Sequence, residues 1–161
     1  MGGQPMETDD LGELVRAATC DVCSTMLDLE LEAVTPYQNP HPLAQGEVTA
    51  LIGIAGDQQG FVSVHCTRSQ AQQLTARLLG EADPITDSDA ILDAMGELVN
   101  MVAGNVKSGY AERGTLQISL PTVVMTPKSE IRVKASYSVV VDFEGPIGRF
   151  CVEVMLAQPG V

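Results

Sequence analysis

The stretch ILDAMGELVNMVAGNVKSGYAERGTLQISLP, Ile91–Pro121, predicts the element around which the rest of this chain is organised. Its first two-thirds has the period of an amphipathic helix, because apolar residues recur every three or four positions. The apolar series is Ile91, Leu92, Met95, Leu98, Val99, Val102 and Val106. One of the polar residues 87–89 can cap the start of the helix, and Gly109 or Gly114 can end it.

A second strip of the same helix is polar. Asp93, Glu97, Asn100 and Gly104 follow one another at spacings of four, three and four, so they lie along one edge of the helix. The simpler interpretation is a solvated helix face with a capping acid. Gly96 and Gly104 favour a functional surface instead, because a glycine inside a helix costs roughly 1 kcal/mol relative to alanine. We expect close packing or access by a partner to explain both glycines.

The run from Asp93 to Ser108, followed after a loop by Ser119–Val123, resembles the CheC/CheX/FliY chemotaxis phosphatases, and CheX most closely. The resemblance covers most of the chain from about Leu11. It implies hydrolysis of the aspartyl phosphate on a response regulator such as CheY. It further implies that Asn100 orients the attacking water and that Glu97 contacts a lysine of the regulator.

The resemblance also implies which residues surround this pair. The residues expected to contact the partner are Asp93, Gly96, Gly104, Lys107 and Pro121. Residues 101–120 separate Asn100 from Pro121, which is slightly fewer than the family pattern suggests. The partner regulator is expected to carry the Mg²⁺, so the chain needs no cofactor or metal of its own.

Composition limits the other functions. The chain has 161 residues, of which 45% are hydrophobic and 4% aromatic, enough for one domain with an aliphatic core. Its net charge of −12 argues against nucleic-acid binding, because the phosphate backbone would be repelled. We find neither a membrane span nor a signal peptide and expect a cytoplasmic protein. Residues 1–9 are expected to form a mobile tail and residues 10–161 a single CheX-like domain.

The cysteines and histidines leave two interpretations open. Cys20 and Cys23 form a C-x-x-C, which can bind metal or act in redox chemistry, or can simply supply small buried thiols. We favour buried thiols because there is no second pair. His65 lies at the end of an expected strand and is interpreted as structural. The sequence predicts no metal site.

The other elements follow from periodicity and turn residues. We expect a helix from Asp9 or Asp10 to about Leu31, a loop over Thr35–Gly46, and a helix capped by Thr67 or Ser69 and stopped by Gly80. Two strands, Glu47–Ala55 and Gly60–Cys66, should form a hairpin. Three further strands are expected at Leu116–Met125, Ile131–Phe143 and Ile147–Ala157, with turns at Thr126–Glu130 and Glu144–Pro146.

An internal repeat relates the two halves of the chain. Leu11–Arg16 aligns on Met95–Asn100 with an offset of 84, since 97 − 13 = 84. The hairpins align at an offset of 85, with Val48–Gly60 on Val133–Gly145. Chance similarity between two amphipathic helices is the alternative explanation. The repeat predicts an α/β fold of the α+β type: two pseudo-symmetric helix-plus-hairpin halves with long helices packed on antiparallel sheet.

In this repeat Glu13 matches Glu97, but Arg16 stands where Asn100 provides the carboxamide. The first half is therefore expected to carry a degenerate, inactive site. The sequence as a whole predicts a response-regulator phosphatase that forms a homodimer. Two alternatives are a non-catalytic module that binds a regulator or a flagellar-switch component through the same helix, and a purely structural dimer.

Overall fold

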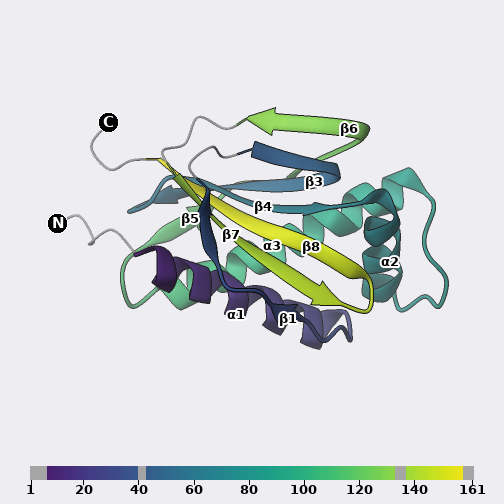
Figure 1. Ribbon diagram of the computed structural model, residues 1–161, viewed down its shortest axis with the longest axis horizontal. Coiled ribbons are helices and arrows are strands. Elements are labelled where there is room, and N and C mark those ends of the chain that lie inside the picture. Colours follow the sequence, from purple (N-terminus) through teal and green to yellow (C-terminus); the bar gives the residue numbers. More distant parts are fainter. Residues whose placement is uncertain (1–6, 40–42, 133–136, 158–161) are drawn as a thin grey trace.

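The computed structural model of the chain describes residues 7–39, 43–132 and 137–157. Helices cover one face of an antiparallel sheet (Figure 1). The helices are α1 (Thr8–Met26), α2 (Arg68–Leu79) and α3 (Ser88–Tyr110). The strands are β1 (Glu32–Ala33), β2 (Tyr37–Asn39), β3 (Leu43–Gly56), β4 (Gly60–Cys66), β5 (Leu116–Ile118), β6 (Thr122–Arg132), β7 (Tyr137–Gly145) and β8 (Gly148–Leu156).

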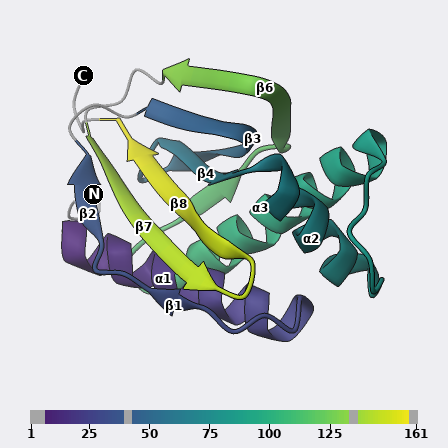
Figure 2. The same ribbon diagram turned by 45° about the vertical axis from the view of Figure 1, so that its right-hand side comes forward.

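The two long helices form the layer beneath the sheet. α1 and α3 lie side by side across it, and α2 stands beside α3 at one end of the molecule (Figures 1 and 2). The buried residues of both helices join one cluster with alternate residues of the strands, including Val48 and Ala50 of β3, Val62 and Val64 of β4, and Val152 and Val154 of β8. This alternation is what a strand with one face on a core requires.

The sheet pairing confirms the two-half architecture. The strand order is β1-β7-β8-β4-β3-β5, and β2 also pairs with β7 while β6 also pairs with β3. Thus β1 and β2 of the first half pair with β7 of the second, and β5 and β6 of the second half pair with β3 of the first. The β3–β4 hairpin corresponds to β7–β8, and the two hairpins join through β4 and β8. The helix α2 connects the halves.

The helix offset of 84 pairs buried residues of α1 with buried residues of α3. The hairpin offset of 85 is wrong, because it aligns residues that occupy different positions in the two hairpins. The helix pairs are Leu11 with Met95, Val15 with Val99, Ala18 with Val102, and Val22 with Val106. In the hairpins, Gly60 begins β4 but Gly145 ends β7, and Asp57 lies in a turn while Asp142 lies inside β7. The residues linking the strands differ in number, three (57–59) against two (146–147), so one offset cannot hold along a hairpin.

Helix ends are set partly by tertiary contacts. Asp87 caps α3 by accepting a hydrogen bond from the Ala90 N–H at 2.9 Å, and Thr67 caps α2 as expected. α1 begins at Thr8 after an uncapped Glu7, which shortens the expected tail, and residues 1–6 lie outside the described residues. It ends at Met26 rather than near Leu31, because Asp28 turns the backbone into the left-handed region with φ of 47°.

The carbonyls at this turn are bound by another helix. The Arg77 guanidinium of α2 donates to the carbonyl oxygens of Leu27 and Asp28, at 3.3 and 2.8 Å.

At the other end of the helix pair, neither expected glycine caps α3, which runs through Gly109 to Tyr110. Gly109 instead leaves room for Leu14 of α1.

Several strand predictions were wrong. The expected strand Leu116–Met125 is two strands, β5 and β6, and β6 continues through the turn expected at Thr126–Glu130. The expected loop Thr35–Gly46 contains β2 and the start of β3. These segments pair with strands far away in the sequence, and local patterns do not report such pairing. The turn expected at Glu144–Pro146 occurs one to two residues later, at 146–147, because Glu144 and Gly145 pair with β8 as the end of β7.

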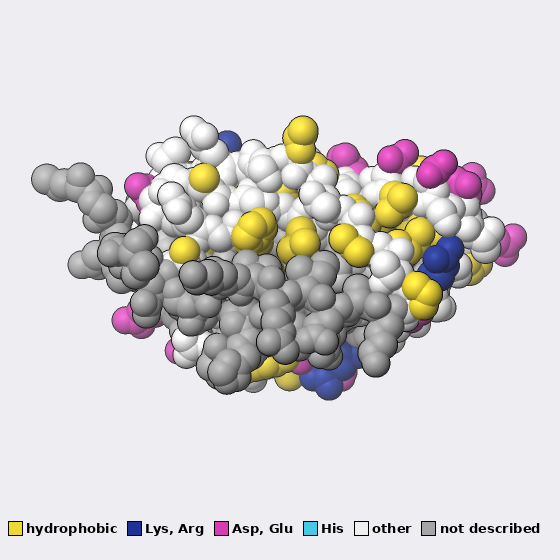
Figure 3. All heavy atoms as spheres, turned by 90° about the horizontal axis from the view of Figure 1, so that it is seen from above, with side chains coloured by type: hydrophobic (Ala, Val, Ile, Leu, Met, Phe, Trp, Pro, Cys, Tyr) yellow, Lys and Arg dark blue, Asp and Glu magenta, His cyan; other side chains and the backbone are white. Residues whose placement is uncertain are grey.

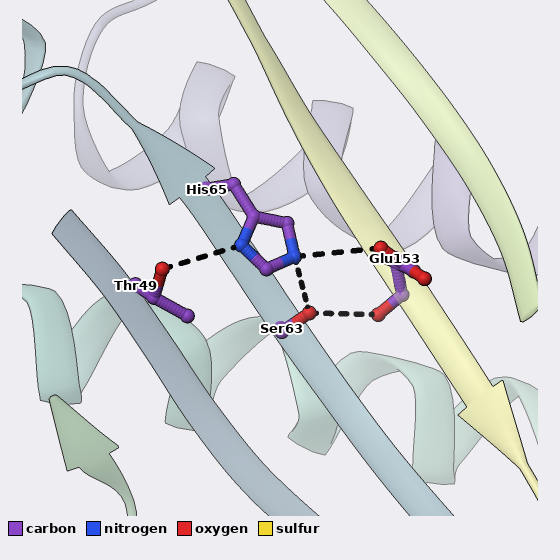
Figure 4. A network of polar contacts seen from close by, with 4 residues as sticks. All are labelled: Thr49, Ser63, His65 and Glu153. Carbon is purple, nitrogen blue, oxygen red and sulfur yellow. Dashed lines mark hydrogen bonds and ion pairs between the residues drawn. The ribbon is translucent and has the colours of Figure 1, made fainter. Parts of the chain in front are cut away.

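The other face of the sheet buries a polar network (Figure 4). His65 Nε2 lies 2.7 Å from Ser63 Oγ and 3.6 Å from Glu153 Oε2, and His65 Nδ1 lies 3.4 Å from Thr49 Oγ1. The side chains of this histidine and this glutamate are each 3% exposed. Each of the four residues alternates with residues that face the helices, so the network lies on the sheet face turned away from them. His65 is therefore structural, as expected, and fully buried.

Candidate functional site

The polar strip of α3 opens onto a groove of about 420 Å³ between the helix and the start of β6. It is lined by Leu92, Asp93, Gly96, Glu97, Asn100, Leu120, Pro121 and Val123. Three of the five residues that the sequence predicts around the functional pair, Asp93, Gly96 and Pro121, therefore line this groove. Glu97 is exposed and Asn100 is half-buried.

The groove wall is formed by Pro121, which lies over Gly96. A methyl group at Gly96 would lie 3.5 Å from Pro121 Cγ and 3.6 Å from Val123 Cγ2, which is ordinary contact. Pro121 and Val123 thus bury Gly96 but leave room for a methyl group there. The other unusual glycine of the helix, Gly104, has still more room, because a methyl group there would meet nothing within 4 Å. Packing within the chain therefore does not explain Gly104.

Ser119 fixes the segment that carries this wall. Its N–H donates to the Gly53 carbonyl oxygen at 2.9 Å, and its Oγ accepts from the Gly53 N–H at 2.9 Å. The same hydroxyl donates to the Leu120 carbonyl oxygen at 3.1 Å. Residues 119–121, which separate β5 from β6, are therefore bonded to β3 through Ser119 and packed on α3 through Pro121.

The polar groups of the expected pair are free of the protein's own interactions. In the part of the chain that the structure describes, the Glu97 carboxylate and the Asn100 carboxamide have no hydrogen bond or ion pair with another residue. A half-buried carboxamide and an exposed carboxylate on a rigid helix are thus both available to a partner. The two remaining expected residues, Gly104 and exposed Lys107, lie on the turns of α3 beyond Asn100, outside the groove lining.

The first half contains a counterpart of this arrangement that the sequence analysis missed. Pro36, just before β2, lies over Gly12 of α1, as Pro121 lies over Gly96, and the two offsets differ by only one: 96 − 12 = 84 and 121 − 36 = 85. A methyl group at Gly12 would lie only 2.5 Å from Pro36 Cβ. The proline therefore packs closer to the helix in the first half. A proline at a matching offset was a signal available in the sequence.

The polar residues of the first half are paired with each other. Arg16 forms an ion pair with Glu13, with Arg16 Nε donating to Glu13 Oε2 at 2.8 Å. The hydrogen bond from Arg16 lowers the pKa of the Glu13 carboxyl group. The same bond raises the pKa of the Arg16 guanidinium. The acid that corresponds to Glu97 is therefore occupied within its own helix.

Leu92, Leu120 and Val123 also line the groove and were not expected at the site. Leu92 was assigned to the buried stripe, but it is half-buried at the groove. Nothing in the local pattern separates these residues from ordinary core or loop positions.

Acidic side chains gather at the end of the molecule where α2 lies (Figure 3). Glu81, Asp83, Asp87 and Asp89 are exposed in and next to the segment that leads into α3.

The thiols have the character of buried side chains. Burial raises the pKa of Cys23 to about 12, and it also raises the pKa of Cys20. Both are free, as are Cys66 and Cys151.

Among the described residues, no three His, Cys, Asp or Glu side chains are grouped to hold a metal ion. No helix in the described ranges has the length and apolar character needed to span a membrane.

Known proteins share both sequence and fold with this chain. The family model for the chemotaxis phosphatase CheX matches residues 48–144, more than half of the chain. The structure of chemotaxis protein CheX from Desulfovibrio desulfuricans is 31% identical, covers 91% of this chain and 98% of its own, and has a TM-score of 0.83. A structure from Desulfovibrio vulgaris Hildenborough is 34% identical, with 91% and 96% covered and a TM-score of 0.83.

A more distant structure is the CheX–CheY–BeF₃–Mg²⁺ complex from Borrelia burgdorferi. The matching chain is 22% identical, with 93% of this chain and 99% of that chain covered and a TM-score of 0.75, and it shows a shared fold. Comparison with curated proteins gives no match. The family model and the two Desulfovibrio structures lead to the same family. The chain therefore belongs to the CheX family of chemotaxis phosphatases.

Proposed function

We propose that this protein hydrolyses the aspartyl phosphate of a CheY-like response regulator by inserting Glu97 and Asn100 into the regulator's active site. The observation that carries the proposal is the unpaired state of both side chains at one groove, in contrast to the Glu13–Arg16 ion pair of the first half. A partner of this kind is supported by the family, and by the Borrelia complex, in which a CheX is bound to CheY.

The chemistry asks for little beyond placement of a water molecule. In a phosphorylated regulator, a lysine and a Mg²⁺ of the regulator hold the phosphoryl oxygens, so the phosphatase needs to align water with the phosphorus atom. Asn100 suits this role because its carboxamide oxygen accepts a hydrogen bond from water while its nitrogen can donate one. The group carries no charge that would repel the phosphoryl oxygens. It also does not change its protonation state with pH.

Glu97 has the complementary role of docking. Its exposed carboxylate lies one helical turn from Asn100 and can pair with the regulator's lysine as α3 enters the active site. Asp93, Gly96 and Pro121 would then surround the contact. Gly104 would let the partner approach the helix closely, which explains a glycine where the chain itself has room for a side chain. Lys107 would contact the partner at the rim. The protein uses no cofactor of its own in this scheme, and the Mg²⁺ belongs to the regulator.

Three further features belong to the same proposal. The protein acts in the cytoplasm, as a single domain from residue 10 onward, and as a homodimer. The dimer is supported by β6, an eleven-residue antiparallel strand that pairs only with β3 among the described strands and so lies at a sheet edge. Light scattering at tens of micromolar should give the dimer mass, and a monomer mass would contradict this part.

Measurement of phosphate release tests the proposal. Purified phosphorylated regulators of the host are each mixed with the protein, and at least one should lose phosphate faster than it does alone. The Asn100→Ala variant provides the control for a contaminating phosphatase. If regulators bind but none is dephosphorylated faster, the chain is a non-catalytic binding module that uses the same helix.

A further inference from the structure

Leu120 is the most exposed large hydrophobic side chain in the described part of the chain. It is 88% exposed, compared with 56% for Leu79 and 51% for Met26. A single exposed leucine is common on protein surfaces and by itself indicates nothing. Leu120 is unusual because it projects into solvent at the edge of the candidate site, from a segment whose neighbouring residues Ser119 and Pro121 are both held in place.

The backbone is fixed on both sides of Leu120. Ser119 before it makes two hydrogen bonds with the backbone of Gly53, one through its own N–H and one through its hydroxyl oxygen, both at 2.9 Å. Its hydroxyl also donates to the Leu120 carbonyl oxygen. Pro121 after it lies over Gly96 and restricts Leu120 to extended backbone conformations. The side chain therefore projects from a short anchored segment. Such preorganisation lowers the entropy cost of a contact with a partner.

The groove also needs a contact that does not depend on charge. Its lining contains two charged residues, Asp93 and Glu97, and both are acids. A partner that presents a phosphoryl group brings more negative charge to this groove, and the chain as a whole carries −12. Glu97 can pair with one lysine, but the rest of the field is repulsive. An apolar contact adds affinity without adding repulsion.

We propose that Leu120 is an apolar anchor that inserts into a hydrophobic pocket of the response regulator beside its phosphorylated aspartate. This inference rests on the proposed function and adds a specificity-determining residue to it. The regulator is the occupant we infer because Leu120 lines the same groove as Glu97 and Asn100. Any partner that receives α3 must therefore cover Leu120 as well.

The test separates binding from turnover. Leu120→Ala should weaken binding to a BeF₃-bound regulator by about tenfold or more, since full burial of a leucine is worth about that factor or more. The KM for dephosphorylation should rise by a similar factor, while kcat at saturating regulator stays within about twofold. Leu120→Met, which keeps the apolar bulk, should behave like the wild-type protein. Leu79→Ala, which truncates an exposed leucine at the end of α2, is the matched control and should change neither quantity.

The outcomes distinguish this inference from the proposed function. If the wild-type protein dephosphorylates a regulator but Leu120→Ala binds that regulator equally well, the anchor is wrong and the phosphatase function stands. If Leu120→Ala converts a dimer into a monomer without weakening regulator binding, a second copy covers Leu120, and the anchor is again wrong. If the wild-type protein neither binds nor dephosphorylates any regulator, both proposals are overturned.

Discussion

Asp21 and Asn105 are hydrogen-bonded across the contact between α1 and α3, with Asn105 Nδ2 3.0 Å from Asp21 Oδ2. They are separated by 84 positions, the offset that relates the two helices, so each is the counterpart of the other. Contact between equivalent residues marks the axis of the pseudo-two-fold. Leu14 lies beside Gly109 and Asp10 pairs with Arg113 at 3.0 Å, so the helices are antiparallel. Glu13 and Glu97 consequently lie at opposite ends of the helix pair.

The first-half site should be silent. Replacing Glu13 or Arg16 with alanine should leave dephosphorylation of the partner within about twofold of wild type, because these residues pair with each other at the end of the molecule remote from Glu97. Initial rates of phosphate release measure this, and circular dichroism verifies the fold. Loss of activity in either folded variant would show that the first half takes part.

Matching glycines should respond differently to the same substitution. Gly12→Ala should destabilise the fold by about 1–3 kcal/mol, because the added methyl group would lie 2.5 Å from Pro36 Cβ and the proline ring cannot yield. Gly96→Ala and Gly104→Ala should be neutral or stabilising by up to about 1 kcal/mol, because the helix gains and little or nothing is displaced. Urea unfolding compares the three variants.

Binding to the regulator tests why position 104 is a glycine. If Gly104 is kept for access by the partner, Gly104→Ala should bind the regulator more weakly although its fold is as stable as wild type or more so. An unchanged affinity would leave this glycine without a role at the interface.

The sequence predicted the repeat, both long helices and the polar strip because these depend on local period and capping. Asp87 and Thr67 cap their helices where a side-chain acceptor precedes an apolar series. The resemblance on α3 and the segment ending at Pro121 was sufficient for the family, which the comparisons then showed. The roles of Glu97 and Asn100 remain predictions.

The remainder depends on contacts between distant segments. The end of α1 is fixed by Arg77 of α2, about fifty positions away, and the break at Ser119 is fixed by Gly53 of β3. β2 is three residues long and exists because β7 offers an edge. The exposure of Leu120 and the closer packing of Pro36 likewise follow from how segments meet, and no local pattern reports this.

The buried pair of His65 and Glu153 should be costly to break. Glu153 Oε1 is buried without a hydrogen-bond partner, and Glu153 Oε2 lies 3.6 Å from His65 Nε2, within ion-pair distance. His65→Ala should lower the free energy of unfolding by roughly 3 kcal/mol or more, because a buried carboxyl group loses its partner. Replacing both residues, as in His65→Leu with Glu153→Met, should recover most of that loss. Denaturant unfolding measures each variant.

A surface ion pair serves as the control for this prediction. Arg149 and Glu144 lie 3.8 Å apart with both side chains 55% exposed. Glu144→Ala should therefore change stability by less than about 1 kcal/mol. If the double replacement at the buried pair were as unstable as His65→Ala alone, the cost would come from lost packing and not from an unpaired polar group.

Asn100→Ala should remove catalysis and leave binding largely intact. The carboxamide places the water in the proposed mechanism, and most of the contact surface survives its removal. By analogy with deletion of one preorganised polar group, the rate should fall on the order of 10²-fold or more, roughly 2.7–4 kcal/mol of barrier. Single-turnover phosphate release and titration against the BeF₃-bound regulator measure the two effects. Full hydrolysis by this variant would exclude the water-positioning role and favour the binding-module interpretation.

Glu97→Ala should fail in a different way from Asn100→Ala. Without the carboxylate, the regulator's lysine has no ion pair as α3 docks, so both affinity and rate should fall. Because the missing contribution is an interaction between charges, the difference in affinity between Glu97→Ala and wild type should shrink as salt is raised. Glu97→Gln keeps the shape and removes the charge, so it should share the binding defect. A variant that binds like wild type at low salt yet turns over slowly would move Glu97 from docking to the chemical step.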